Sequence, residues 1–162
     1  MNKKLLVIVP CGQAKVWKKE PNHGPIKAKF AYKSSPFAIN RKFAEKFSDK
    51  WMILSAKYGF IEPDFVIPKD YNVTFKEPST KPINLESLRN QVLSSNAIRG
   101  YGIVIALGGR EYTMMVQKAF MDISNVVVPT KGMNLFDAMR EVSLLSKLDK
   151  KVMLKRIGVS DE

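Results

Sequence analysis

A run of four apolar residues, 51–54, ends in a segment whose side chains are suited to chemistry. Ser55 supplies a hydroxyl, Lys57 an amine and Tyr58 a phenol, while Gly59 lets the backbone turn sharply or approach a ligand. An apolar run without alternation is typical of a strand covered on both faces. Ligands of open α/β sheets bind beyond the carboxyl ends of the strands. This segment is therefore either part of a binding site or a plain strand-to-loop turn.

A second polar segment follows the apolar run 5–10. It contains Cys11, Gly12, Gln13 and Lys15. The thiol of Cys11 is either a nucleophile or a small buried side chain, because both are common uses of a single cysteine.

Two adjacent glycines follow the apolar run 103–107. Gly108 and Gly109 precede Arg110 and Tyr112, where a helical pattern begins. Glycines between a strand and a helix, with a cation beside them, are typical of an anion site at a helix N-terminus. The spacing matches neither a dinucleotide fingerprint nor a phosphate-binding P-loop, so a tight turn without a ligand is the alternative.

Aromatic and basic residues alternate between positions 16 and 35, where Phe30 and Tyr32 lie among lysines. Such a mixture suits a surface that holds phosphates and stacks on bases. Another segment, 61–82, comes after Gly59 in the sequence. It is rich in proline and aspartate and contains Asp64 and Tyr71. A loop of this length with little regular structure is usually either functional or disordered. If it is functional, we expect it to fold over the crevice beside Ser55.

These segments require a scaffold that brings them together. The hydrophobic pattern predicts strands at 5–10, 51–54, 103–107 and 125–129, and helices at 36–49, 84–98, 112–121 and 135–148, with Asn84 as a helix cap. Strands that alternate with helices favour a single α/β domain over residues 1–162, with a central, mostly parallel sheet of about four strands flanked by helices. The polar segments would then meet at one edge of the sheet.

The charge balance indicates the class of partner. The 162 residues carry a formal charge of +12 and a pI near 9.8, above the value of about 9 that is typical of nucleic-acid-binding domains. We therefore expect a nucleic-acid partner, DNA rather than RNA. A basic surface kept for solubility is the alternative.

The rare residues limit the chemistry and the compartment. One cysteine allows no internal disulfide and favours the reducing cytoplasm, and one histidine with one cysteine cannot build the usual zinc sites. We expect neither a metal nor a cofactor. No apolar run approaches the roughly 18 residues of a membrane span, so we expect no membrane partner. No pattern specifies an oligomeric state.

Several motifs together resemble a family of uncharacterised bacterial and phage proteins. They are Val-Pro-Cys-Gly-Gln-Ala-Lys at 9–15, Ala-Tyr-Lys-Ser-Ser-Pro-Phe at 31–37, Ile-Leu-Ser-Ala-Lys-Tyr-Gly at 53–59, then Pro63-Asp64 and Tyr71. Their order is also distantly similar to that in the YaaA peroxide-stress proteins. The strand followed by Pro-Cys-Gly-Gln resembles the first loop of uracil-DNA glycosylase-like folds, but the single histidine, His23, departs from that superfamily's later motif.

The resemblance and the charge together suggest a DNA glycosylase-like enzyme that acts on a modified base. Breaking an N-glycosidic bond places positive charge on the sugar, so a carboxylate that positions water is useful, and Asp64 is the candidate. Lys57 would hold phosphates or the departing base, or form an imine. The residues expected to bind the nucleic acid or base are Cys11, Gly12, Gln13, Lys15, Tyr32, Phe37, Ser55, Tyr58, Gly59, Tyr71, Gly108, Gly109, Arg110 and Tyr112.

Two other functions are compatible with the same residues. A non-catalytic DNA- or RNA-binding protein would use only the cationic surface, and its affinity would fall steeply with salt. An enzyme of free nucleotides would bind a phosphate at the Gly108–Arg110 loop, and its surface charge would be incidental.

Overall fold

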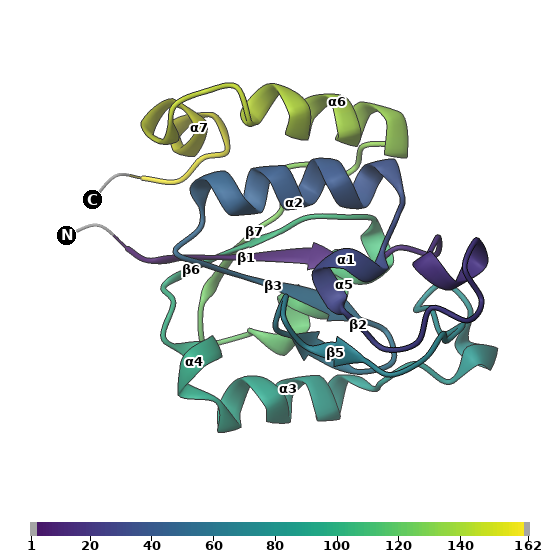
Figure 1. Cartoon of the computed structure of the whole chain (residues 1–162). Coiled ribbons are helices and arrows are strands. Elements are labelled where there is room, and N and C mark those ends of the chain that lie inside the picture. The colour runs from purple at the N-terminus through teal and green to yellow at the C-terminus, as the bar shows by residue number, and fades with distance from the viewer. Residues whose placement is uncertain (1–2, 161–162) are drawn as a thin grey trace.

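The computed structural model describes residues 3–160 and has a five-stranded sheet at its centre, in the order β4-β3-β1-β6-β7 (Figure 1). The strands are β1 Leu5–Pro10, β3 Lys50–Ser55, β4 Gly59–Ile61, β6 Ile103–Ala106 and β7 Asn125–Val127. All neighbouring strands are parallel except β4, which runs antiparallel to β3. The prediction of an α/β fold with a mostly parallel sheet is confirmed. Strand β4 was not predicted, because it comes only three residues after β3, in a segment predicted to be a loop.

The sheet is buried on both faces, as its unbroken apolar runs predict. Along β1, Leu5, Val7 and Val9 face one hydrophobic core, and Leu6 and Ile8 face the other. This alternation follows from the two-residue period of a strand. Both cores are therefore built from one set of continuous apolar segments.

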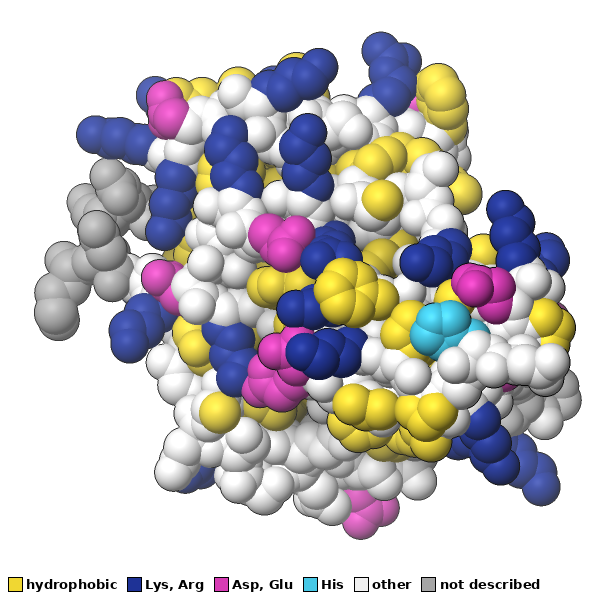
Figure 2. All heavy atoms as spheres, in the orientation of Figure 1, with side chains coloured by type: hydrophobic (Ala, Val, Ile, Leu, Met, Phe, Trp, Pro, Cys, Tyr) yellow, Lys and Arg dark blue, Asp and Glu magenta, His cyan; other side chains and the backbone are white. Residues whose placement is uncertain are grey.

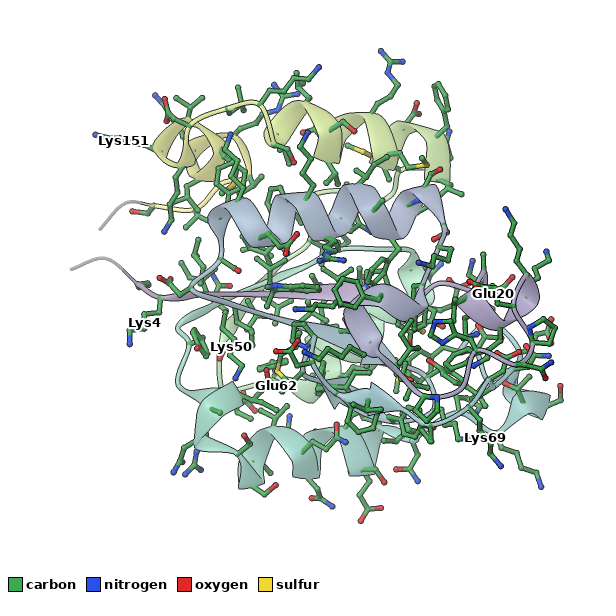
Figure 3. All side chains as sticks on the ribbon, viewed as in Figure 1. Lys4, Glu20, Lys50, Glu62, Lys69 and Lys151 are labelled. Carbon is green, nitrogen blue, oxygen red and sulfur yellow. The ribbon has the colours of Figure 1, made fainter. Side chains whose placement is uncertain are left out.

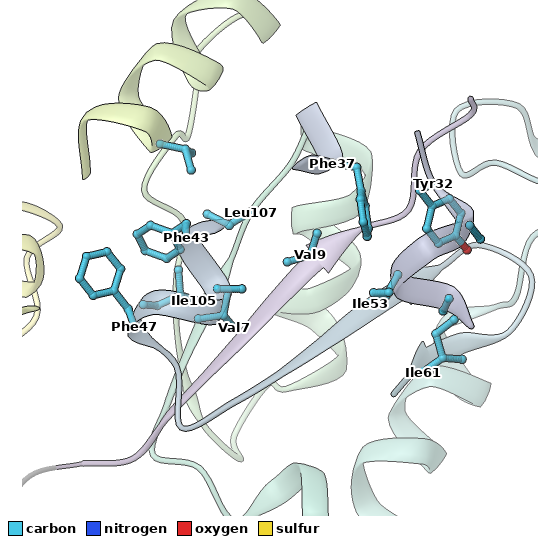
Figure 4. Packing of buried hydrophobic residues seen from close by; sticks show 14 of the residues in the cluster. Val7, Val9, Tyr32, Phe37, Phe43, Phe47, Ile53, Ile61, Ile105 and Leu107 are labelled. Carbon is cyan, nitrogen blue, oxygen red and sulfur yellow. The ribbon is translucent and has the colours of Figure 1, made fainter. Parts of the chain in front are cut away.

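Helices cover each face of the sheet. On one face lie α2 (Ser35–Phe47), α6 (Leu135–Leu145) and α7 (Lys150–Arg156), and on the other lie α3 (Leu85–Ser94), α4 (Asn96–Arg99) and α5 (Arg110–Ala119) (Figure 1). Figure 4 shows Phe43 and Phe47 of α2 above the sheet, near Val7 and Ile105, and their two ring centroids are 5.1 Å apart. The aromatic side chains along one face of α2 therefore belong to the hydrophobic core.

Helix α3 begins where the sequence predicts a capping residue. The side chain of Asn84 accepts a hydrogen bond from the N–H of Ser87, which confirms it as the cap of α3. The single helix predicted at 84–98 is wrong in one respect, because the chain becomes extended at Ser95 (φ −118°, ψ 110°) and divides the segment into α3 and α4. Hydrophobic periodicity continues through such a break, so it does not reveal it.

A small second layer lies near the carboxyl end of β3. It contains β2 (Ile26–Lys27), α1 (Ala28–Ala31) and β5 (Val66–Ile67), with short 3-10 turns at Val16–Lys18 and Pro78–Thr80. Strands β2 and β5 pair in antiparallel fashion. As predicted, residues 61–82 contain little regular structure beyond β5 and the turn at Pro78–Thr80, and the pairing of β5 with β2 holds this segment against Ile26 and Lys27. Among residues 3–160, no helix is long and apolar enough to cross a membrane.

Candidate active site

Six side chains from five separate segments form a polar cluster at the carboxyl edge of the sheet. Cys11 and Lys15 follow β1, Ser55 ends β3, and Tyr112 lies in α5 after β6. Segments that the strands do not position directly supply the last two members, Tyr32 and Tyr71. All six were predicted as binding residues, and the hydrogen bonds and ring contacts below bring them together.

Tyr32, Tyr71 and Ser55 form a chain of hydroxyl groups. The two phenol oxygens are 2.5 Å apart, and the Tyr71 oxygen is 2.9 Å from Ser55 Oγ. Ser55 Oγ also accepts the N–H groups of Lys57 (3.2 Å) and Tyr58 (3.1 Å).

The direction of the hydrogen bonds between these hydroxyl groups follows from the number of donors and acceptors that each group has. A serine oxygen has two acceptor lone pairs, and the two N–H groups occupy both at Ser55. Its own proton must then go to Tyr71, whose proton goes to Tyr32. The proton of Tyr32 has no acceptor within this network, so Tyr32 is the end that can donate to a bound molecule.

A second set of contacts joins Cys11 to Tyr112. The thiol donates to the Tyr112 oxygen at 3.7 Å, and that oxygen lies 3.4 Å from Thr74 Oγ1. The ring of Phe75 packs on Tyr112 with centroids 4.9 Å apart. Thr74 and Phe75 were not predicted, because a threonine and a phenylalanine within 61–82 show no pattern that marks them.

Lys15 is the buried amine of the cluster. It is only 9% exposed, and its Nζ lies 4.4 Å from the ring centroid of Tyr71. Burial lowers the pKa of Lys15 because the ammonium loses water, while negative charge on Cys11 and Asp70 opposes the shift. No carboxylate among residues 3–160 forms an ion pair with this amine. Lys15 is therefore closer to its neutral, nucleophilic form than an exposed lysine.

Lys57 and Tyr58 lie at the rim of the cluster. Lys57 is exposed, and its Nζ is 5.3 Å from the ring of Tyr58 and 5.7 Å from that of Tyr71. The half-buried ring of Tyr58 packs edge-on against Tyr71 at 5.5 Å. Gly59 has a positive φ of +81°, and Gln91 holds the turn by donating to the Tyr58 carbonyl and accepting the Phe60 N–H. The sharp turn predicted at this glycine is confirmed.

Asp64 lies in a different environment from the cluster. It is exposed and forms ion pairs with Lys29 (2.9 Å) and Lys27 (3.7 Å), which lower the pKa of its carboxyl group. Nearby, Lys50 and Glu62 form another ion pair at 2.6 Å, which ties β3 to the end of β4 (Figure 3). The roles predicted for Asp64 and Lys57 stay predictions.

The remaining predicted residues divide into buried and exposed groups. Phe37 is buried and packs on Tyr32 with ring centroids 5.1 Å apart. Gly109 and Arg110 are exposed at the start of α5, and Gln13 is exposed beside Gly12. Gly108 has φ +112° and lies against the ring of Pro10. The two glycines thus make a tight turn, and the anion site predicted there stays a prediction.

No group of three or more histidine, cysteine, aspartate or glutamate side chains comes together within residues 3–160 to hold a metal ion. The cluster instead offers phenols, a hydroxyl, a thiol and an amine. Its chemistry is that of proton donation and amine or thiol nucleophiles.

Burial raises the pKa of Tyr32, Tyr71 and Tyr112 above the usual value of 10.0, and negative charge on Cys11 adds to each shift. All three phenols are therefore protonated donors at neutral pH. A raised pKa in the folded state contributes stability that is complete below about pH 10 and is lost as the pH rises further.

We expect the free energy of unfolding to fall as the pH rises above about 10, and to fall less in Tyr71→Phe, which lacks one of the shifted phenols. Urea denaturation at a series of pH values measures both slopes. The variant should already be less stable at neutral pH, by about 2 kcal/mol, since it loses two hydrogen bonds of about 1 kcal/mol each. Equal alkaline losses in the two proteins would contradict the raised pKa of Tyr71.

Comparisons with known proteins identify relatives without an assigned function. The family described as "Family of unknown function (DUF6884)" matches residues 6–142. The uncharacterised protein YfjM of Bacillus subtilis (strain 168) is 32% identical over 126 residues, which cover 78% of this chain and 83% of that protein. The crystal structure of AF0587, a protein of unknown function, aligns with 94% of this chain at 13% identity and a TM-score of 0.42. This chain spans 48% of the length of that one.

Proposed function

This chain belongs to the family of unknown function DUF6884, and we propose that it is a cytoplasmic enzyme that acts on a nucleobase in DNA. Most concretely, it releases a modified base by breaking the N-glycosidic bond. The observation that carries the proposal is the buried amine of Lys15, which lies over the ring of Tyr71 at the carboxyl edge of the sheet, with the phenol of Tyr71 hydrogen-bonded to that of Tyr32. The charge of +12 supports a polyanionic substrate.

The amine of Lys15 is the nucleophile in this proposal. Its neutral form attacks C1′ of the sugar, the bond between C1′ and the base breaks, and the base leaves with the electron pair. The attached nitrogen loses a proton, the sugar ring opens to an imine, and water hydrolyses the imine to regenerate the amine. A nucleophilic lysine needs a lowered pKa, which burial supplies to Lys15.

The leaving base needs a proton, and Tyr32 is placed to provide it. Its phenol is the donating end of the chain that runs from Ser55 through Tyr71. The proton released by the attached amine restores the phenol, so the two steps balance. A positioned general acid typically contributes about 10²–10⁴-fold to a rate.

The sequence resemblance to uracil-DNA glycosylase-like folds supports the same reaction class, although it places a carboxylate in the role of water activation. Asp64 is the candidate for that role, and its ion pairs with Lys27 and Lys29 keep it ionised. The amine mechanism and the carboxylate mechanism differ in one measurable way, because only the first passes through a covalent enzyme–DNA intermediate.

The test is to incubate the purified protein with DNA that contains normal and hypermodified bases, and to analyse released bases by mass spectrometry. Sodium borohydride, which reduces an imine to a stable amine, is added to a parallel sample. We expect a released base and a covalent adduct on the peptide that contains Lys15. A released base without an adduct would favour Asp64, and no release from any DNA would overturn the proposal.

A further inference from the structure

A basic hollow is lined by residues of α1, of α2 and of the turn between them, and Tyr32 is the member of the polar cluster that it includes. Its volume is about 310 Å³, and its lining includes Lys29, Phe30, Tyr32, Lys33, Arg41 and Lys42. Four of these six side chains are cations, and Glu45 is the carboxylate that accompanies them. Figure 2 shows dark-blue side chains around a hydrophobic one in the middle of this face.

Phe30 is the unusual member of this basic hollow. It is 46% exposed, although it is a large apolar side chain that is not needed by either core. The Nζ of Lys29 lies 5.2 Å from its ring centroid, and the guanidinium carbon of Arg41 lies 5.4 Å from it. An exposed ring between cations is the arrangement that stacks on a base while phosphates bind beside it.

The cations of the hollow divide into anchored and exposed groups. Arg41 donates to the Lys29 carbonyl (2.8 Å) and forms an ion pair with Glu45 (3.2 Å), so it is fixed in place. Lys29 pairs with Asp64. Lys33 and Lys42 are exposed at the rim, where a phosphate can approach them. Arg41 therefore positions the ring, and the two rim lysines carry the electrostatic attraction.

We propose that this basic hollow binds single-stranded nucleic acid, with a base stacked on Phe30 and the adjacent phosphates on Lys33 and Lys42. A paired base in a duplex cannot lie flat on a ring within a hollow, which is why a single strand is favoured. The proposal rests on the proposed function for what happens to the strand, since Tyr32 borders both the hollow and the polar cluster. A strand held here would lie against Tyr32, the residue that the hollow shares with the cluster.

The test measures binding of a fluorescent oligothymidylate of about 15 nucleotides to the full chain over a range of salt concentrations. In Lys33→Gln/Lys42→Gln, affinity at low salt should fall at least about tenfold, and the salt slope should decrease by about 1.4, or 0.7 for each lost phosphate contact. In Phe30→Ala, affinity should fall about tenfold with an unchanged salt slope. Phe30→Trp should restore the affinity, and its fluorescence should be quenched by the bound strand.

The matched control is Lys150→Gln/Lys151→Gln, which removes the same charge from α7, where Lys151 points away from the hollow (Figure 3). These lysines are exposed, so neither double variant should change the thermal melting temperature. Equal losses in the two double variants would mean diffuse attraction and would overturn the proposal. Equal binding of duplex, or of anionic vesicles, with no effect of Phe30→Ala would also overturn it.

The base-release assay distinguishes this proposal from the proposed function. If binding depends on Phe30 but no base is released, the hollow is a single-strand binding site and the proposed enzyme activity is wrong. If a base is released, and at the same rate in the Phe30 and rim-lysine variants, the proposed enzyme activity stands and the proposed role of the hollow is wrong.

Discussion

Replacement of Lys15 by methionine should reduce base release at least about a thousandfold, as expected when the group that forms the covalent bond is lost. It should also abolish the borohydride-trapped adduct. Methionine has nearly the same length without the charge, so the cluster can remain packed around it. Because a buried ammonium loses hydration, we expect the variant to be at least as stable as the natural protein. Base release, adduct formation and urea denaturation measure the three effects.

The pH profile separates a nucleophile from a positioning residue. Burial lowers the pKa of Lys15 below its usual value of 10.5, so the fraction of neutral amine, and with it the rate of adduct formation, should rise at a lower pH than for an ordinary lysine. If Lys15 is only structural, its substitution should change the free energy of unfolding but not the pH dependence of adduct formation.

The matched control is Lys57→Met, the same change at the exposed lysine that approaches the same ring of Tyr71. We expect the borohydride-trapped adduct to persist in this variant, while DNA binding weakens through loss of the phosphate contact predicted for Lys57. Loss of the adduct in Lys57→Met but not in Lys15→Met would transfer the nucleophile to Lys57. An active Lys15→Met with an inactive Asp64→Asn would identify the carboxylate mechanism.

Substitution of Gly108 by alanine should destabilise the fold by about 3 kcal/mol, the sum of about 1–2 for the left-handed backbone and a similar cost for overpacking. The residue has φ +112°, and an added Cβ would lie 2.5 Å from Cγ of Pro10. Pro10 ends β1 and its ring has little freedom to move, so β1 or the start of α5 must shift instead. Urea denaturation measures the loss.

Gly132→Ala provides the control, since this glycine also has a positive φ (+80°) but no atom within 4 Å of an added Cβ. It should cost only the backbone part, about 1 kcal/mol. Similar losses in the two variants would mean that the contact with Pro10 contributes nothing. A stable Gly108→Ala that loses nucleotide binding would instead favour the anion site predicted at this loop.

The sequence by itself determined the scaffold. The apolar runs in β1, β3 and β6 predict buried parallel strands, and the run at 125–129 predicts a fourth short strand, which is the partly exposed edge strand β7. The cap at Asn84 marks the beginning of α3. From that scaffold follows the edge at which Cys11, Ser55 and Tyr112 meet. These are local signals, since a hydrophobic period and a cap are each read within a few residues.

The tertiary structure decided which of these groups act together. Lys15 and Lys57 are both lysines in loops after strands, yet one is buried over Tyr71 and the other is exposed. Tyr32 and Tyr71, 39 residues apart, meet only because β2 and β5 pair. The pKa of a group depends on the water and charge that its neighbours remove or supply, and distant segments provide those neighbours here. No local pattern therefore contains the difference between the two lysines.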